Sequence, residues 1–193
     1  MSAIQSVAVF CGSRAGNDPA FAEATRALGQ GLAAAGIRLV YGGGRIGLMG
    51  VLADAVMAAG GQASGVIPDF LQQLEVAHQG LTELEITDTM HSRKKRMSDI
   101  ADAFVTMPGG LGTLDETIEI ITWRQLKLHD KPILICDING SARPLLAAIE
   151  AAIEMGFARP DARNLYEAVD GVPAVLARLT ALPVIHGETS ALV

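Results

Sequence analysis

Short apolar runs alternate along this chain with longer stretches in which apolar residues recur at helical spacing. The short runs end in glycine, proline or polar residues, which is typical of buried strands, whereas the longer stretches predict helices. The predicted strands are residues 6–11, 37–41, 63–67, 84–87, 102–107 and 132–136. The predicted helices are residues 19–35, 48–59, 90–101, 113–128, 144–155 and 172–182.

This alternation predicts a parallel sheet covered by helices on both faces, because parallel neighbours need a crossover connection. The predicted fold class is α/β, a Rossmann-like, doubly wound parallel sheet. We expect one nucleotide-binding domain over residues 1–193, with an ordered core from about residue 5 to residue 183 and a loose C-terminal tail. Since glycine turns follow several strands, a ligand is expected at the carboxyl ends of the strands.

The most informative stretch is Pro-Gly-Gly-Leu-Gly-Thr-Leu-Asp-Glu, residues 108–116. It joins a strand to a helix, and its glycines let the backbone turn tightly and approach a ligand. Thr113 is the predicted N-cap of that helix, with Glu116 completing a capping box. The free N–H groups at such a helix start favour an anion, so a phosphate site is predicted here. Its candidate residues are Pro108, Gly109, Gly110, Gly112 and Thr113.

A second glycine run, Gly-Gly-Gly-Arg-Ile-Gly at residues 42–47, matches the dinucleotide pattern G-x-G-x-x-G. It follows the second predicted strand, whereas the dinucleotide pattern belongs to the first strand-to-helix turn. Pro68 also precedes Asp69 at the position expected for a ribose-binding carboxylate. Both observations disfavour NAD. We interpret Gly43 and Gly44 as phosphate contacts, with tight packing of the helix on the sheet as the alternative.

A basic helix is predicted at residues 90–101, and its spacing gives it two different faces. Met90, Arg93 and Met97 lie three or four residues apart and therefore share one face, which excludes Lys95. An inward arginine needs a partner. That partner is either a structural carboxylate or an anionic ligand in the cleft. Lys94 is placed at the cleft rim, and Met90 and Lys94 are candidate binding residues.

Ser13 and Arg14 follow the first predicted strand, at the mouth of the same cleft. Serine is common in turns, so a simple turn and a phosphate contact are both open for this pair. Ser13 is included among the candidate phosphate ligands.

Composition narrows the classes of protein. Half of the 193 residues are hydrophobic, but no apolar run is long enough to span a bilayer, and the N-terminus shows no signal peptide. The formal charge of −6 disfavours a nucleic-acid surface. Two cysteines in strand-like runs predict free thiols and a cytoplasmic protein, and four scattered histidines give no metal site.

Two motifs at this spacing, Met-His-Ser-Arg-Lys at residues 90–94 and the glycine run at residues 108–116, resemble the LOG (Lonely Guy) family. The family consists of cytokinin-activating phosphoribohydrolases, some once labelled lysine decarboxylases. The likeness extends from Val7 to about Leu182. The resemblance implies that Arg93 and Glu116 are catalytic. The family usually has Glu where this chain has Ser92, which leaves open whether nucleotide contacts near residue 92 differ.

The implied reaction is hydrolysis of an N6-modified adenosine 5′-monophosphate, and of AMP as a further candidate, to the free base and ribose 5-phosphate. Cleavage of an N-glycosidic bond develops positive charge on the sugar, which a carboxylate stabilises. We therefore assign Glu116 to stabilising the cation or activating water, and Arg93 to orienting Glu116 or holding the substrate. No cofactor or metal is implied.

Two other functions are considered. Molybdenum-cofactor carrier proteins share the Pro-Gly-Gly-x-Gly-Thr run, so a non-catalytic nucleotide or molybdenum-cofactor binding protein is the alternative. A decarboxylase dependent on pyridoxal phosphate is disfavoured, because the candidate lysines offer no apparent pocket for a Schiff base.

A homodimer is predicted from residues 48–59, which are apolar on nearly every face apart from Asp54. A helix that is apolar all round is buried on all sides. The helix after the glycine turn has a similar apolar excess, and a two-fold pairing through both helices would cover them. The alternative is that residues 144–182 fold back over these faces within one subunit.

Overall fold

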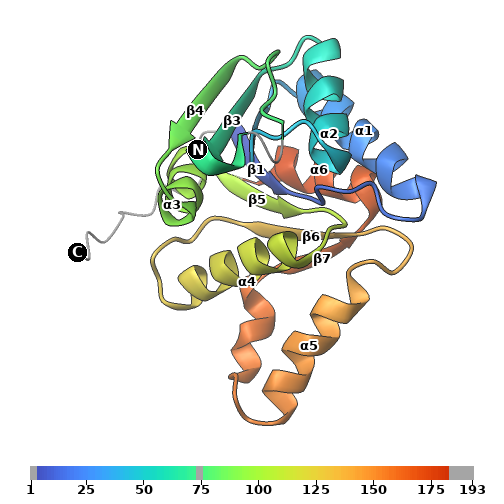
Figure 1. The fold of residues 1–193 in the computed structure, drawn as a ribbon. Coiled ribbons are helices and arrows are strands. Elements are labelled where there is room, and N and C mark those ends of the chain that lie inside the picture. Colours follow the sequence, from blue (N-terminus) through green and yellow to red (C-terminus); the bar gives the residue numbers. More distant parts are fainter. Residues whose placement is uncertain (1–3, 73–75, 183–193) are drawn as a thin grey trace.

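The computed structural model describes residues 4–72 and 76–182, which form a seven-stranded parallel sheet (Figure 1). The strands lie in the order β4-β3-β2-β1-β5-β6-β7. Their bounds are β1 Ser6–Phe10, β2 Arg38–Tyr41, β3 Ala63–Pro68, β4 Glu83–Thr87, β5 Ala103–Thr106, β6 Ile133–Asp137 and β7 Glu167–Asp170. The helices are α1 Pro19–Ala34, α2 Gly47–Ala58, α3 Met90–Ile100, α4 Leu111–Gln125, α5 Arg143–Glu154 and α6 Gly171–Ala181, with short 3-10 turns η1 Asp69–Leu71 and η2 Pro160–Leu165.

The strand order reverses direction between β1 and β5, which are neighbours in the sheet. From β1 the chain builds outward through β2, β3 and β4, and then crosses back to β5 and builds the other half. The helices that follow β1 and β5 pack on opposite faces of the sheet, and this arrangement favours a ligand crevice at the carboxyl ends of the two strands. The predicted doubly wound, Rossmann-like class is confirmed.

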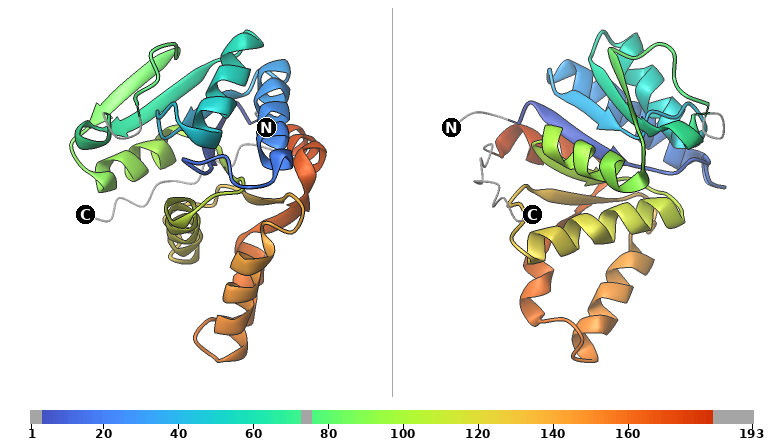
Figure 2. Two further views of the ribbon diagram at one scale, coloured as in Figure 1. Left: turned by 45° about the vertical axis from the view of Figure 1, so that its right-hand side comes forward. Right: turned by 60° about the vertical axis from the view of Figure 1, so that its left-hand side comes forward.

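Two hydrophobic clusters cover the two faces of the sheet. One joins the inner sides of α1, α2 and α6 to the sheet, and the other joins α3, α4 and α5. The central strands are buried on both faces, as helices on each side require. In Figure 2, α5 and the segment after it extend away from the sheet as an arm.

The strand β7 is absent from the sequence prediction because its residues, Glu-Ala-Val-Asp, carry little apolar signal. It lies at the edge of the sheet and buries only Val169, so its pairing with β6 depends on backbone hydrogen bonds. An edge strand needs no continuous apolar run, which explains the omission.

Helix α2 is covered within its own subunit, contrary to the reason given for a dimer. Helix α1 lies against it, and Gly29 allows the close approach, since a β-carbon there would lie 2.8 Å from Ala55 Cβ. Only Asp54 and Ala58 of this helix are exposed. Helix α4 keeps an apolar surface, with Leu111 86%, Leu114 39% and Ile118 42% exposed.

Across residues 4–72 and 76–182, every helix is too short or too polar to cross a membrane. The predicted loose tail, from about residue 186 onward, lies outside the residues that the structure describes.

Candidate active site

The glycine turn places the start of α4 at the crevice between β1 and β5. Gly110 is the N-cap, and helix α4 begins at Leu111. As a glycine, Gly110 has no side chain with which to cap the helix, so the first N–H groups of α4 suit another acceptor. Gly12 and Gly109 let the two loops touch, because a β-carbon at Gly12 would lie 3.3 Å from the α-carbon of Gly109.

The predicted capping box at Thr113 and Glu116 is wrong, because the helix starts two residues earlier. Thr113 lies inside the first turn and is buried, and a β-carbon at Gly109 would overlap its hydroxyl group. Its carbonyl oxygen accepts a hydrogen bond from Thr117 Oγ1 at 2.6 Å. The carboxylate of Glu116 faces Arg93 on α3.

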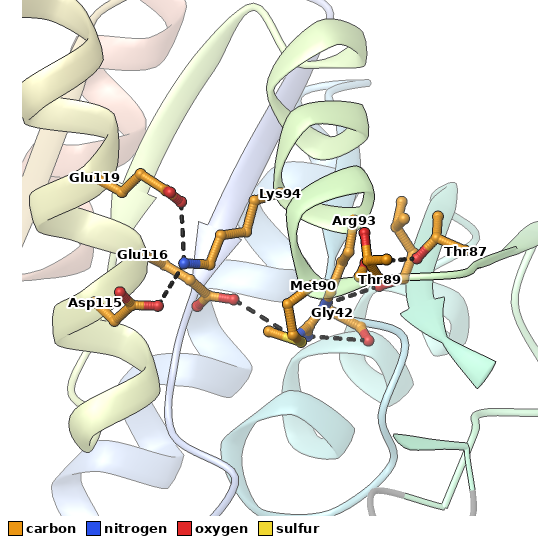
Figure 3. Close-up of polar contacts among 10 residues, drawn as sticks. Gly42, Thr87, Thr89, Met90, Arg93, Lys94, Asp115, Glu116 and Glu119 are labelled. Atoms are coloured by element: carbon orange, nitrogen blue, oxygen red, sulfur yellow. Dashed lines mark hydrogen bonds and ion pairs between the residues drawn. The ribbon is translucent and has the colours of Figure 1, made fainter. Parts of the chain in front are cut away.

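Arg93 points inward from α3, as its helical spacing predicts, and is only 4% exposed. Its Nε donates to the carbonyl oxygen of Val66 at 3.1 Å, and its Nη2 donates to that of Gly42 at 3.3 Å. Its Nη1 lies 3.8 Å from Oε1 of Glu116, whose side chain is 12% exposed. The guanidinium group is thus held by two strand ends and directed at one carboxylate (Figure 3).

Gly42 is required by this arrangement. A β-carbon there would overlap the Arg93 guanidinium group, which reaches past the end of β2. The first glycine of the second glycine run therefore makes room for an arginine rather than for a pyrophosphate.

Arg93 and Glu116 line a cavity of about 190 Å³. Its other walls are the glycine turn, the loop after β1 and apolar side chains from α2, η1, α3 and α4. Together these are Cys11, Ser13, Met49, Leu71, Met90, Gly110, Leu111, Gly112, Thr113 and Asp115. The cavity therefore offers a paired carboxylate, an uncapped helix start and an apolar wall in one place.

A larger cavity of about 690 Å³ lies on the other side of the glycine turn. It shares Ser13, Gly110, Leu111 and Gly112 with the small cavity, and adds Pro108, Gly109 and the exposed Arg14. The turn at the start of α4 thus lines both cavities.

Most of the residues predicted for the site are gathered here, in one or both cavities. They are Ser13, Met90, Arg93, Pro108, Gly109, Gly110, Gly112, Thr113 and Glu116. Among the described residues, Gly43 and Gly44 line neither cavity. Gly43 packs against β3, since a β-carbon there would lie 3.2 Å from Ile67 Cβ, and Gly44 forms a bridge with Ala77.

Lys94 is directed at α4 rather than at the glycine turn, and pairs with Asp115 at 2.5 Å and Glu119 at 3.0 Å. The sequence interpretation did not include Met49, Leu71 or Leu111, which line the small cavity. Met49 could have been found from the sequence, because it lies in the first turn of the helix that follows the glycine run at residues 42–47. Leu71 had no such signal, since it belongs to the short turn η1.

Within residues 4–72 and 76–182, no group of three or more His, Cys, Asp or Glu side chains is arranged to hold a metal ion.

Solved structures with a similar fold include the molybdenum cofactor carrier protein from Chlamydomonas reinhardtii, with a TM-score of 0.69 and 18% identity over 92% of this chain and 98% of that one. The molybdenum cofactor binding protein from Rippkaea orientalis matches with a TM-score of 0.69 and 18% identity, over 93% of this chain and 96% of that one. At this identity the likeness establishes the fold alone.

Sequence relatives are much more similar. The cytokinin riboside 5′-monophosphate phosphoribohydrolase of Rhodococcoides fascians is 44% identical over 161 residues, which is 83% of this chain and 81% of the relative. The enzyme of that name called LOG1 from Arabidopsis thaliana is 40% identical over 178 residues, 92% of this chain and 84% of the relative. A family model described as "Possible lysine decarboxylase" matches residues 49–179. The chain therefore belongs to the LOG family.

Proposed function

We propose that this protein hydrolyses the N-glycosidic bond of N6-modified adenosine 5′-monophosphates, and of AMP, to release the free base and ribose 5-phosphate. The observation that carries this proposal is the Arg93–Glu116 pair in a cavity beside an uncapped helix start. Relatives at 40–44% identity that carry the phosphoribohydrolase name support it.

The chemistry follows from the carboxylate. As the bond between C1′ of the ribose and the base breaks, the sugar takes on oxocarbenium character, and a nearby carboxylate stabilises that charge. The oxygen of a water molecule then bonds to C1′, and its proton ends on the departing base. Glu116 faces the cavity as a carboxylate paired with Arg93 and so suits either stabilising the cation or activating the water.

Arg93 is suited to a positioning role toward Glu116. Two backbone carbonyl groups, on Val66 and Gly42, hold its guanidinium group before any substrate arrives. A group that is already in place loses little entropy in the transition state, which is how preorganised sites lower a barrier.

The 5′-phosphate is assigned to the start of α4. The N–H groups of Leu111, Gly112 and Thr113 belong to the first turn of a helix without a side-chain cap among the described residues. Such groups and the helix dipole favour an anion. Ser13 adds a hydroxyl group on the facing loop and lines both cavities.

The base and its N6 group are assigned to the apolar part of the small cavity. Met49, Leu71 and Met90 form this part, together with Leu111. Flexible methionine side chains adapt to irregular apolar ligands. An apolar N6 substituent therefore suits this wall better than a charged one.

A non-catalytic nucleotide or molybdenum-cofactor binding protein is the second candidate, because the glycine run at residues 108–113 also suits a protein that only binds. A protein that only binds has no need for a carboxylate aimed into the cavity, so Glu116 favours hydrolysis.

Purified protein incubated with AMP and with isopentenyl-AMP tests the proposal. We expect AMP to give free adenine and isopentenyl-AMP to give free isopentenyladenine, each with one ribose 5-phosphate per base released. Binding of both nucleotides without release of either base would instead support the binding protein.

We also propose that the protein is a cytoplasmic homodimer that pairs through α4. Both cysteines are buried and neither forms a disulfide within the described residues, which suits a reducing compartment. The exposed Leu114 and Ile118 line a groove of about 540 Å³ along α4, together with Trp123. A second copy of this face would cover these side chains by the commonest symmetry.

A further inference from the structure

Charged residues of both signs meet where α3 lies beside α4. Helix α3 contributes Arg93 and Lys94, and α4 contributes Asp115, Glu116 and Glu119. The two cations pair with different carboxylates. Arg93 faces Glu116, whereas Lys94 faces Asp115 and Glu119, which precede and follow Glu116 in the sequence. Figure 3 shows the Lys94 ammonium group between Asp115 and Glu119.

The Lys94 contacts are close, and the lysine side chain is itself mostly buried, whereas the side chain of Asp115 is 61% exposed. Its Nζ lies 2.5 Å from Asp115 Oδ2 and 3.0 Å from Glu119 Oε2, and its side chain is only 13% exposed. Burial pushes the pKa of Lys94 down, but the two carboxylates outweigh it and hold the pKa above its ordinary value. Lys94 is therefore a cation held in place by two anions.

Without Lys94, the negative charges of Asp115 and Glu119 would repel each other. Asp115 and Glu119 lie four residues apart on α4, where like charges repel. Asp115 also lines the small cavity with Glu116, next to the turn assigned to the substrate phosphate. Unneutralised charge at this point would oppose a phosphate dianion as well as a further carboxylate.

We propose that Lys94 is a positioning residue that offsets part of the negative charge of Asp115 and Glu119, so that the cavity beside Glu116 accepts a phosphate dianion. The proposal rests on the proposed function for the place of the phosphate. It differs from direct binding, because Lys94 acts here through the two carboxylates and not through contact with the substrate.

Calorimetric binding of ribose 5-phosphate tests the proposal without turnover. Lys94→Met keeps the length of the side chain and removes its charge, and is expected to weaken binding about tenfold at low salt. The difference should shrink as salt rises. Lys95→Met is the matched control, since it removes the same charge from an exposed position on the same helix and should change affinity less than about twofold.

The decisive variant is Lys94→Met combined with Asp115→Asn and Glu119→Gln. If Lys94 acts by offsetting the charge of the two carboxylates, this triple variant, which has lost all three charges, binds ribose 5-phosphate at least as tightly as the wild type. Binding that stays as weak as in Lys94→Met would overturn the proposal, because a lost phosphate contact or a lost mechanical link cannot be restored by removing carboxylates. Unchanged binding in Lys94→Met, or no binding by the wild type, would overturn it too.

Asp115→Asn with Glu119→Gln, in a chain that retains Lys94, covers the case in which Lys94→Met does not fold. This variant should bind at least as tightly as the wild type, and weaker binding contradicts the proposal. Hydrolysis of AMP adds a separate readout, in which Lys94→Met should raise KM about tenfold with a smaller change in kcat. A wild type that binds ribose 5-phosphate but releases no base would contradict only the proposed function.

Discussion

At the scale of single residues, the site depends on one arginine whose guanidinium group the protein itself holds in place before a substrate binds. A buried guanidinium group is costly unless its donors are satisfied, and here backbone carbonyl groups of Val66 and Gly42 satisfy two of them. The remaining direction faces Glu116. The two interpretations left open for Arg93, a structural ion pair and a place in the cleft, are therefore compatible.

Glu116→Gln should abolish base release, with kcat reduced at least about 100-fold, while AMP still binds. The amide keeps the shape of the side chain but cannot stabilise a positive sugar or activate water. Single-turnover assays and calorimetric binding to the same preparation measure the two effects. Near-normal turnover in a folded variant would contradict the role assigned to Glu116.

Gly42→Ala should mimic the loss of Arg93, because the added β-carbon overlaps the guanidinium group. We expect kcat/KM to fall at least about tenfold in Gly42→Ala and in Arg93→Ala, and the double variant to be no worse than Arg93→Ala. Lys95→Ala serves as the control, since this exposed residue pairs only with Asp99 among the described residues. Additive losses in the double variant would mean that the two positions act independently.

At the scale of elements, α3 and α4 begin in opposite ways. Helix α3 is closed by a capping box, in which Thr89 Oγ1 accepts from the Ser92 N–H at 3.0 Å and Ser92 Oγ accepts from the Thr89 N–H at 3.1 Å. The start of α4 has no such side chain among the residues described. The open start of α4 lines both cavities, whereas the capped start of α3 contributes the side chains of Met90 and Arg93 to the small one.

Ser92→Ala should lower the melting temperature by about 2 °C, since one capping bond is worth roughly 1 kcal/mol. Ser92→Glu should restore it, because Glu also completes a capping box and is the residue usual in the LOG family. We expect AMP hydrolysis to change less than about twofold in both variants, since Ser92 lines neither cavity. A large rise in KM in either variant would place residue 92 in contact with the substrate.

The open start of α4 predicts a strict requirement for the 5′-phosphate. AMP should be cleaved with kcat/KM at least about 100-fold above that for adenosine. Only AMP carries a phosphate that can bind at the helix start and the glycine turn. Steady-state assays with the two substrates at matched concentrations compare them. Equal rates would show that the glycine turn has only a structural role.

At the scale of the whole molecule, the doubly wound sheet brings together loops from distant parts of the chain. The crevice between β1 and β5 collects the loop after β1, the start of α2 and the start of α4, and α3 adds Arg93 from the side. Asp115 of α4 lines both the small cavity and the groove on the outer face of this helix. A second copy of the chain bound in that groove would therefore lie next to the site.

Light scattering at low micromolar concentration tests the dimer. We expect a mass of about twice the 20.1 kDa of one chain. Ile118→Asp should convert the protein to a monomer, because a charge on the exposed face of α4 opposes its burial against a second copy. Leu126→Asp introduces the same charge at an exposed apolar position beyond the end of α4, outside the groove, and should leave the dimer intact. A wild type of one chain mass would contradict the dimer.

Local patterns in the sequence were enough to predict the layered α/β fold, the place of the glycine turn and the inward direction of Arg93. Each depends on neighbours within a few residues, because strand alternation, tight turns and helical spacing are set along the chain. The tertiary structure alone decided the rest. The partners of Arg93 and Lys94 come from other elements. The edge strand β7 is held by backbone pairing with β6, and α2 is covered by α1. Contacts between segments far apart in the chain leave no periodic signal in either segment, which is why the Lys94 bridge could not be predicted from the sequence.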